Sequence, residues 1–304
     1  MTIDLVNLRA TSLFLQKTEL KFDLLSAVEE LQRQIHLEFD FMREARVMDT
    51  IAQHLQRLSR SVRVPRSVPG LVSQRLMVMT YMDGLPLLQL KDKVAHLPQW
   101  KREKAARGIL RRVSEAYGHM ILGEGLFQAD GHPGNILVQH GGRVALLDYG
   151  QSKQLGEEDK HAFAALVLAM NKGDKPAISA ALGRLHVHTS SRDVNLLSEM
   201  AYGMFDTRGK VDPFDKNSPI ARAAVEKFPP DMFFVLRVVQ LLRGMANGMG
   251  IDEFSTADQW APLARQTIKK AQKKDDKRRR QQRVQQAQPV CDLAATATPL
   301  QLTV

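Results

Sequence analysis

The stretch FQADGHPGNILV (residues 127–138) is followed, after a short turn, by LLDYGQSKQL (residues 146–155). The first stretch has the pattern D-x-x-x-x-N from Asp130 to Asn135, and Asp148 follows a second apolar segment. Phosphoryl transfer needs a carboxylate near the nucleophile and oxygen ligands for the magnesium ions that neutralise the phosphates. A loop of this pattern, followed by an acid at the end of an adjacent strand, supplies both.

The alternative is that the glycines, proline and asparagine of this loop only form turns, and that the acids face water. A helix before the loop, a hairpin between the two acids and apolar residues on both strands favour a metal-phosphate site. His132 could be a metal ligand, but we expect it to stabilise the loop, because magnesium prefers oxygen.

A second feature is HLEFDFMREA (residues 36–45), which lies in a segment predicted to be helical over residues 23–58. Asp40 and Glu44 are one helical turn apart, where like charges repel. Either Arg43, Arg46 and solvent screen them, or they await cationic partners, as the helix glutamate of a protein kinase awaits its strand lysine.

Together, and in this order and spacing, the three stretches resemble the UbiB family of atypical protein-kinase-like proteins, also called the ADCK family. The resemblance implies an α+β, kinase-like fold with a truncated N-lobe (a helix and a β-hairpin) and a mostly helical C-lobe. It also implies site residues, carried over position by position. Asp130 matches the catalytic-loop acid, and Asn135 and Asp148 match the ligands of Mg²⁺ or Mn²⁺.

The resemblance further implies how ATP is bound and regulated. Glu44 matches the partner of a nucleotide-binding lysine, and the hinge that meets the adenine of ATP contains Met79, Tyr81 and Met82. Glu38 and Asp40 match a regulatory E-x-D motif.

Two departures from the family pattern stand out. Nothing before Glu44 resembles the family's alanine-rich phosphate loop, its V-A-V-K strand or its K-x-G-Q helix, and Lys17 and Lys21 lie in helical sequence. We therefore expect the chain to begin inside the N-lobe and to bind nucleotide more weakly. The second departure is Gly131, where the family usually has proline; glycine is expected to loosen the loop.

Along the chain, the pattern predicts three regions: a partial N-lobe (residues 1–84), a helical C-lobe with the catalytic and metal-binding loops (85–268) and a basic, flexible tail (269–304). Residues 61–68 and 73–84 are expected to pair as a hairpin that turns at Pro69 and Gly70. We expect a helix over residues 100–123, strands at 136–138 and 144–147, and helices from Glu157 onward. Their breaks are predicted at four places: Gly173, Gly183, residues 212–213 and residues 229–230. The helix over residues 100–123 is expected to have one apolar face, formed by Ile109, Val113, Ala116, Tyr117 and Met120.

The composition, 304 residues with 44% hydrophobic and 25% charged, is that of a globular protein. Much of the net charge of +10 lies in residues 269–286, which favours a solvated helix end or tail. Attraction to an anionic membrane surface is a second interpretation, and no nucleic-acid contact is expected. The single cysteine, Cys291, excludes an internal disulfide framework.

Membrane insertion and export are not predicted. The most apolar long stretch, residues 232–250, contains Arg237, Gln240 and Arg243, so it predicts a helix packed in a core. The N-terminus, MTIDLVNLRA, lacks the basic start and apolar run of a signal peptide.

For function, the resemblance implies ATP binding and ATPase or atypical kinase activity that supports isoprenoid quinone or other prenyl-lipid metabolism. It places this activity at a mitochondrial or plastid membrane, with nucleotide and an isoprenoid lipid as partners. One alternative is a lipid-associated scaffold that binds nucleotide weakly or not at all. Another is a small-molecule phosphotransferase, against which HLEFDFMREA and the sequence DYGQ (residues 148–151) argue. The phosphoryl acceptor and the oligomeric state stay open.

Overall fold

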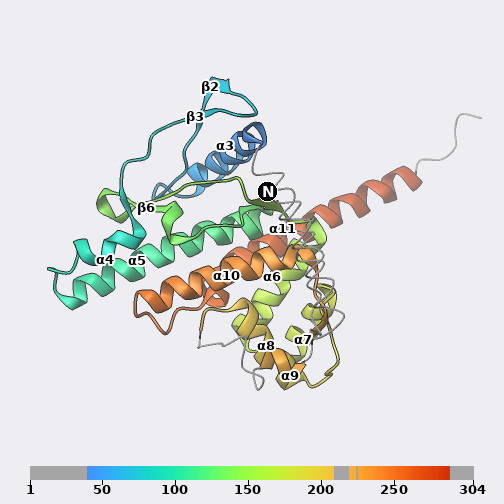
Figure 1. Ribbon diagram of the computed structural model, residues 1–304. Coiled ribbons are helices and arrows are strands. Elements are labelled where there is room, and N and C mark those ends of the chain that lie inside the picture. Colours follow the sequence, from blue (N-terminus) through green and yellow to red (C-terminus); the bar gives the residue numbers. More distant parts are fainter. Residues whose placement is uncertain (1–39, 209–218, 224, 288–304) are drawn as a thin grey trace, which may run out of the picture.

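A four-stranded sheet brings the two motif stretches together in the computed structural model, which describes residues 40–208, 219–223 and 225–287 (Figure 1). Its strand order is β1 (Val62–Arg63), β7 (Val144–Leu146), β6 (Ile136–Val138) and β4 (Leu85–Pro86). β1 runs parallel to β7, whereas β6 is antiparallel to both β7 and β4. The predicted hairpin of β6 and β7 is confirmed, and a 3₁₀ turn, η4 (His140–Gly142), connects its strands.

The first described helix is α3 (Phe41–Leu58). It buries Met48, Ile51, Ala52 and Leu55, which recur at helical spacing. Asp40 caps its N-terminus by accepting a hydrogen bond from Arg43 N (3.0 Å). The helix predicted over residues 23–58 is therefore confirmed from residue 41, and its earlier part lies outside the described residues.

A separate hairpin pairs β2 (Ser67–Val72) with β3 (Met77–Met79). The predicted turn at Pro69 and Gly70 is wrong, because both residues lie inside β2, where the strand register shifts. The chain reverses at residues 73–76 instead, where Ser73 N donates to Leu76 O (2.7 Å) and Leu76 N donates to Ser73 Oγ (3.1 Å). The strand predicted over residues 61–68 is also divided, since its first part forms β1 in the other sheet.

The long helix α5 (Gln99–Gly118) confirms the helix predicted from residue 100, and a π-helical turn, η2 (His119–Glu124), continues it. It follows a 3₁₀ turn, η1 (Leu87–Gln89), and the short helix α4 (Leu90–Lys93). Gly118 allows α11 (Thr256–Ala287) to approach closely, because a Cβ atom there would lie 2.6 Å from Trp260 Cδ1. The predicted apolar face of α5 and η2 is buried, and it comprises Ile109, Val113, Ala116, Tyr117 and Met120.

The rest of the C-lobe is mostly helical. Gly173 ends α6 and Pro229 caps α10, as predicted. The break predicted at Gly183 is also confirmed to within one residue, because α7 ends at Arg184. Residues 212–213 lie outside the described residues. A small antiparallel sheet of β9 and β10 was not predicted. The remaining elements are β5 (Leu126–Gln128), η3 (Pro133–Asn135), β8 (Ser152–Gln154), α6 (Glu157–Lys172), α7 (Lys175–Arg184), β9 (His188–Thr189), α8 (Val194–Phe205), α9 (Pro219–Ala223), β10 (Val225–Lys227) and α10 (Pro230–Gly248).

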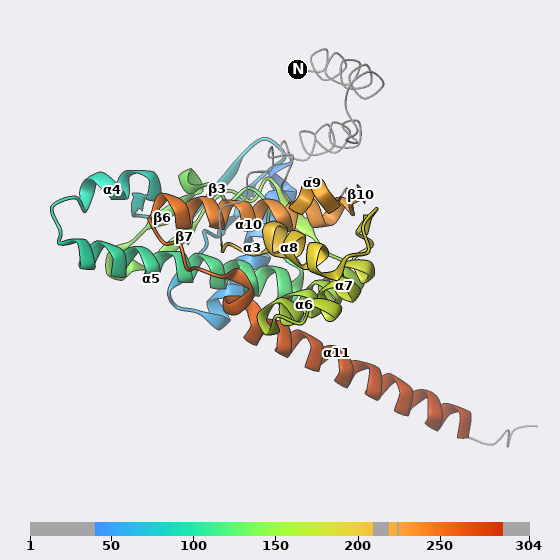
Figure 2. The ribbon, with the colours of Figure 1, turned by 90° about the horizontal axis from the view of Figure 1, so that it is seen from below.

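Helices α5 and α10 lie side by side under the sheet, with α6 to α9 grouped at one end of the molecule (Figures 1 and 2). α10 is the predicted core helix, and its Arg243 is only 4% exposed. The buried guanidinium is stabilised by hydrogen bonds that it donates to Gln240 Oε1 (2.7 Å) and to carbonyl groups that include Gly203 O (2.8 Å). Among the described residues, no helix has the length and apolarity needed to cross a membrane. The boundary predicted at residue 269 falls within α11, which runs unbroken to Ala287.

Candidate functional site

The side chains of Asn135 and Asp148 meet at the end of the β6–β7 hairpin. Asn135 Nδ2 donates to Asp148 Oδ2 (3.3 Å) and to the backbone oxygen of Asp130 (3.4 Å). Leu147 N donates to Asn135 O (2.8 Å), which fixes the two ends of the hairpin against each other. The three residues predicted from the D-x-x-x-x-N loop and the following acid therefore lie together.

The backbone of Asp148 adopts the left-handed conformation, with φ of 63°. This region is sparsely populated by residues other than glycine, although aspartate tolerates it better than most. Gly150 N donates to Asp148 Oδ1 (3.0 Å), and the amide of Gln128 donates to the backbone oxygens of Leu147 and Asp148. Strained residues of this kind gather at functional sites, where surrounding bonds hold them in place.

Below this acid, Tyr117 and Gln128 form a buried support. Tyr117 Oη donates to Gln128 Oε1 (3.1 Å), and both side chains are at most 2% exposed. Burial raises the pKa of the Tyr117 hydroxyl well above its usual value, and the nearby charge of Asp130 raises it further. Tyr117 therefore stays neutral and acts as a hydrogen-bond donor to Gln128.

Tyr117 also explains Gly131. A Cβ atom at Gly131 would lie 1.5 Å from Tyr117 Oη, so the loop passes over the tyrosine only because residue 131 has no side chain. Glycine is expected at this position to loosen the loop, whereas in the structure Gly131 packs tightly against the Tyr117 hydroxyl. His132 has the structural role predicted for it, because its Nδ1 accepts a hydrogen bond from Gly134 N (3.1 Å).

Helix α3 reaches the second acid through Glu44 and Arg43. Glu44 Oε1 accepts a hydrogen bond from Tyr149 N (3.1 Å), and the side chain is 9% exposed. Burial raises the pKa of Glu44, which the Tyr149 hydrogen bond partly offsets. Arg43 donates to Gly150 O (3.1 Å) and Ser152 O (2.9 Å), so it binds carbonyl groups as well as neighbouring the acids. Within the described part of the chain, Glu44 forms no ion pair with a lysine.

On the other side, Arg237 of α10 binds the predicted catalytic acid. Its Nη2 donates to Asp130 Oδ1 (2.7 Å), and its Nη1 donates to Gln151 Oε1 (3.2 Å). Both residues of the ion pair are partly exposed, at 47% for the arginine and 25% for the aspartate. The contact orients one oxygen of Asp130 toward α10.

The donor set fits a hard divalent cation. Asn135 uses its Nδ2 in the hydrogen bonds above, so its Oδ1 and the carboxylate of Asp148 are oxygen ligands of the kind that magnesium accepts. Among the described residues, no group of three or more His, Cys, Asp or Glu side chains could hold a metal. Two protein ligands suffice where substrate phosphates and water complete the shell.

The predicted hinge residues and Asp40 form no hydrogen bond with Asp130, Asn135 or Asp148 in the described part of the chain. Tyr81 is 91% exposed and Met79 41% exposed. Met82 lines a separate cleft of about 710 Å³ together with Leu55 and Thr80. Asp40 caps α3, and Glu38 lies outside the described residues.

Several residues of the cluster were not predicted as site residues: Tyr117, Gln128 and Arg237. Gln128 lies two residues before Asp130, and a polar residue directly after Phe127 in a short strand was the sequence signal that could have indicated a site role. Tyr117 was predicted only as part of an apolar face. Arg237 is 107 residues from Asp130, so only the fold brings them together.

This loop and the hairpin that follows it are those of a kinase-like protein. Residues 1–182 match the family described as the ABC1 atypical kinase-like domain. The chain belongs to this family, which confirms the resemblance to UbiB and ADCK proteins.

Curated relatives agree. AarF domain-containing kinase 1 of Drosophila melanogaster is 25% identical over 76% of this chain and 46% of its own length. AarF domain-containing protein kinase 1 of Gallus gallus is 31% identical over 54% of this chain and 31% of its own length. The Arabidopsis thaliana protein ACTIVITY OF BC1 COMPLEX KINASE 8, chloroplastic, is 26% identical over 66% of this chain and 26% of its own length. The chain thus spans about half, or less, of these relatives.

Among solved structures, the complex of Rv3197 with erythromycin from Mycobacterium tuberculosis has a similar fold. The TM-score is 0.57 with 16% sequence identity, and the match covers 87% of this chain and 67% of the other. This likeness supports the kinase-like fold.

Proposed function

We propose that the chain carries the metal and catalytic site of an ATP-dependent atypical kinase or ATPase, with Mg²⁺ or Mn²⁺ as cofactor. The observation that carries the proposal is the meeting of Asn135 and Asp148 beside Asp130, with Asp148 held in a left-handed conformation. Membership of the ABC1 atypical kinase-like family supports it.

In this proposal each residue has a distinct role. Asn135 Oδ1 and the Asp148 carboxylate would hold the metal, which when bound neutralises charge on the phosphates. Asp130 would orient the hydroxyl or water that attacks, through the oxygen that Arg237 leaves free. Gln128 and Tyr117 hold Asp148 in position before any ligand arrives.

For the nucleotide, Glu44 is the proposed partner of a lysine that binds the α- and β-phosphates. Its carboxylate already accepts from Tyr149 N, next to Asp148, so a cation there would lie close to the metal site. Met79, Tyr81 and Met82 are the proposed contacts of the adenine, and Glu38 with Asp40 the proposed regulatory motif.

We further propose that this activity supports isoprenoid quinone or other prenyl-lipid metabolism at a plastid or mitochondrial membrane. The family resemblance supports the metabolic role, and two Arabidopsis relatives carry "chloroplastic" in their names, which favours the plastid. The exposed basic end of α11 would suit an anionic membrane surface. Loss of the gene should then lower the cellular content of a prenyl quinone.

Nucleotide binding is tested by thermal unfolding with and without ATP plus Mg²⁺ or Mn²⁺. We expect ATP with metal to raise the Tm of the wild type, and Asp148→Asn to lose most of this rise. Asp252→Asn, an exposed acid far along the chain, is the matched control and should keep the rise. If neither the wild type nor Asp148→Asn responds, the enzymatic proposal fails and the lipid-associated scaffold is the better description.

A further inference from the structure

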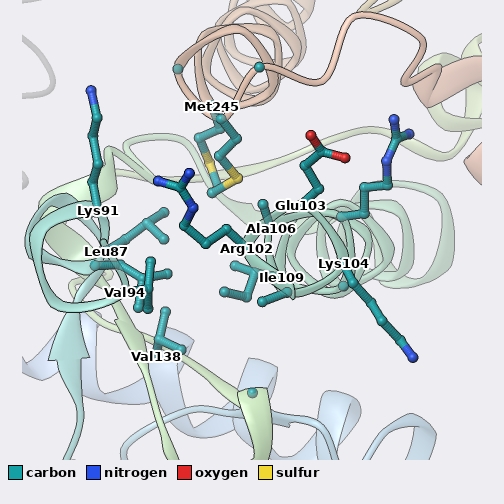
Figure 3. A pocket seen from close by; sticks show the side chains of 18 of the residues that line it. Leu87, Lys91, Val94, Arg102, Glu103, Lys104, Ala106, Ile109, Val138 and Met245 are labelled. Atoms are coloured by element: carbon teal, nitrogen blue, oxygen red, sulfur yellow. The ribbon is translucent and has the colours of Figure 1, made fainter. Parts of the chain in front are cut away.

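A large cavity lies between α5, α10 and the β6–β7 hairpin, apart from the three residues of the proposed metal site. Its volume is about 1360 Å³, above the roughly 300–1,000 Å³ of ordinary ligand clefts. Figure 3 shows Leu87, Val94 and Val138 on one side of it, Ala106 and Ile109 of α5 on the other, and Met245 of α10 above them. These six residues therefore form apolar walls on three sides of the cavity.

The rim carries strong positive charge. Among the described residues, seven lysines and arginines line the cavity and Glu103 is the one acid that does. None of the seven forms an ion pair with an acid in the described part of the chain. In Figure 3, Arg102 reaches from α5 into the cavity, and Lys91 stands on the opposite side. Arg102 and Lys91 thus line an apolar cavity, and neither forms an ion pair with an acid among the described residues.

Two glycines of α10 keep the cavity open. Gly244 and Gly248 are one helical turn apart and both line it. A Cβ atom at either position would meet nothing within 4 Å, so internal packing does not require glycine there. Gly244 lies inside α10, where glycine lowers helix stability relative to alanine, and no packing contact offsets this loss. Gly248 is the last residue of the helix.

Exposed apolar side chains continue the cavity at its edge. Leu88, which lines it, is 68% exposed, and Trp100, between two lining residues, is 61% exposed. Large exposed apolar groups next to a cleft indicate a binding surface rather than ordinary surface.

From these observations we propose that the cavity binds a single-chain anionic amphiphile, a molecule with a long apolar chain that ends in a phosphate. The chain would lie against Ile109, Val138 and Met245 along Gly244 and Gly248, and the phosphate would bind Arg102 and Lys91. Pro133 also lines the cavity and opens the same 3₁₀ turn as Asn135, so the ligand would touch the element that carries a proposed metal ligand. The inference does not depend on nucleotide binding.

The test is calorimetric titration of the nucleotide-free chain with oleoyl lysophosphatidic acid below its micelle concentration. Glycerol 3-phosphate serves as the head alone and monooleoylglycerol as the chain alone. We expect saturable binding of the complete amphiphile, at least tenfold tighter than binding of either part. Equal binding of glycerol 3-phosphate would reduce the site to a phosphate site, and equal binding of monooleoylglycerol would reduce it to an apolar surface; each result overturns the proposal.

Two pairs of variants locate the site. The double charge reversal Lys91→Glu with Arg102→Glu should weaken binding about tenfold or more, whereas Lys93→Glu with Lys273→Glu, which changes the net charge equally outside the cavity lining, should leave it within about twofold. Gly244→Leu with Gly248→Leu should fill the cavity and abolish binding, whereas Gly183→Leu, a helix glycine with equally open surroundings, should not. Equal effects within either pair would overturn the proposal.

A final arm separates a monomeric ligand from a bilayer. Vesicles of phosphatidylcholine with phosphatidic acid are added in a sedimentation assay. Sedimentation with vesicles, in the absence of any binding of the monomeric amphiphile, would show a membrane-binding surface instead of a ligand site and overturn the proposal. Loss of ATP response in the chain would leave these results unchanged, so the two proposals fail separately.

Discussion

Arg237, on α10, donates through Nη2 to Asp130 Oδ1 over 2.7 Å, and it is the contact through which the helical C-lobe holds the predicted catalytic acid. The same guanidinium also donates to Gln151 Oε1, just after the Asp148-Tyr149-Gly150 segment. The Arg237 side chain therefore connects the loop that carries Asp130 to the segment that follows Asp148.

Replacing this arginine should affect turnover far more than stability. Because the pair is partly exposed, Arg237→Gln should change the free energy of unfolding by less than about 1 kcal/mol. ATPase turnover should fall about tenfold or more, since Asp130 loses the group that orients it. Arg237→Lys should recover part of the turnover. Unchanged turnover in Arg237→Gln, measured beside an intact thermal response to ATP, would contradict the positioning role.

The contact between Gly131 and Tyr117 predicts a steric cost. Gly131→Ala would place a Cβ atom 1.5 Å from Tyr117 Oη, so the loop has to move, at a cost of roughly 1–3 kcal/mol. Gly183→Ala, inside α7 with open space around it, should instead stabilise the chain by about 0.5–1 kcal/mol. Chemical denaturation of both variants checks the difference, and a shared sign would rule out the steric explanation.

Gln128 is predicted to hold the backbone of Asp148. In Gln128→Leu, the oxygens of Leu147 and Asp148 and the hydroxyl of Tyr117 lose their partner, at about 1–3 kcal/mol for each group left unsatisfied. Gln154→Leu removes an exposed amide that also donates to two carbonyls, and it should cost less than about 1 kcal/mol. Denaturation midpoints of the two variants that coincide would show that the buried amide has no special role.

Glu44 predicts a pH dependence of stability. Its pKa in the folded chain is raised above the ordinary 4.5, mainly by burial, so the folded state binds the proton more tightly than the unfolded state. The contribution of this group to stability is therefore present at low pH and is lost as pH rises from 4.5 through the raised pKa. Glu44→Gln keeps an oxygen for Tyr149 N and removes the titration.

The measurement is Tm against pH for the wild type and Glu44→Gln. Relative to the variant, the wild type should lose stability across that window. Glu44→Ala, which leaves Tyr149 N without its acceptor, should be less stable than Glu44→Gln at every pH. Parallel curves for the wild type and Glu44→Gln would show that this carboxyl does not titrate abnormally.

Local features of the fold could be predicted from the sequence. The strands β6 and β7 match the predicted segments closely because each is a short apolar run beside a glycine-rich turn, and both signals act within a few residues. The buried face of α5 follows equally from helical spacing.

Contacts between residues far apart in the chain could not be predicted from the sequence. The pairing of β1 with β7 joins Val62 to Val144, and no local pattern selects that partner. The turn at residues 73–76 depends on the Ser73 hydroxyl, whereas Pro69 and Gly70 carry the stronger turn signal but occur at a shift in strand register. The ion pair of Arg237 with Asp130 likewise requires α10 to be in place, so charge alone could not reveal it.

The helix α11 has a consequence for geometry at longer range. Thr267 Oγ1 donates to Leu122 O, which anchors the helix to the body, and residues 269–287 then extend outward (Figure 2). At 1.5 Å per residue, this part measures about 28 Å. A loop of equal length would permit any separation up to a limit, whereas a stiff rod fixes one separation. A partner that binds residues 269–287 is thereby held at a fixed distance from the catalytic loop.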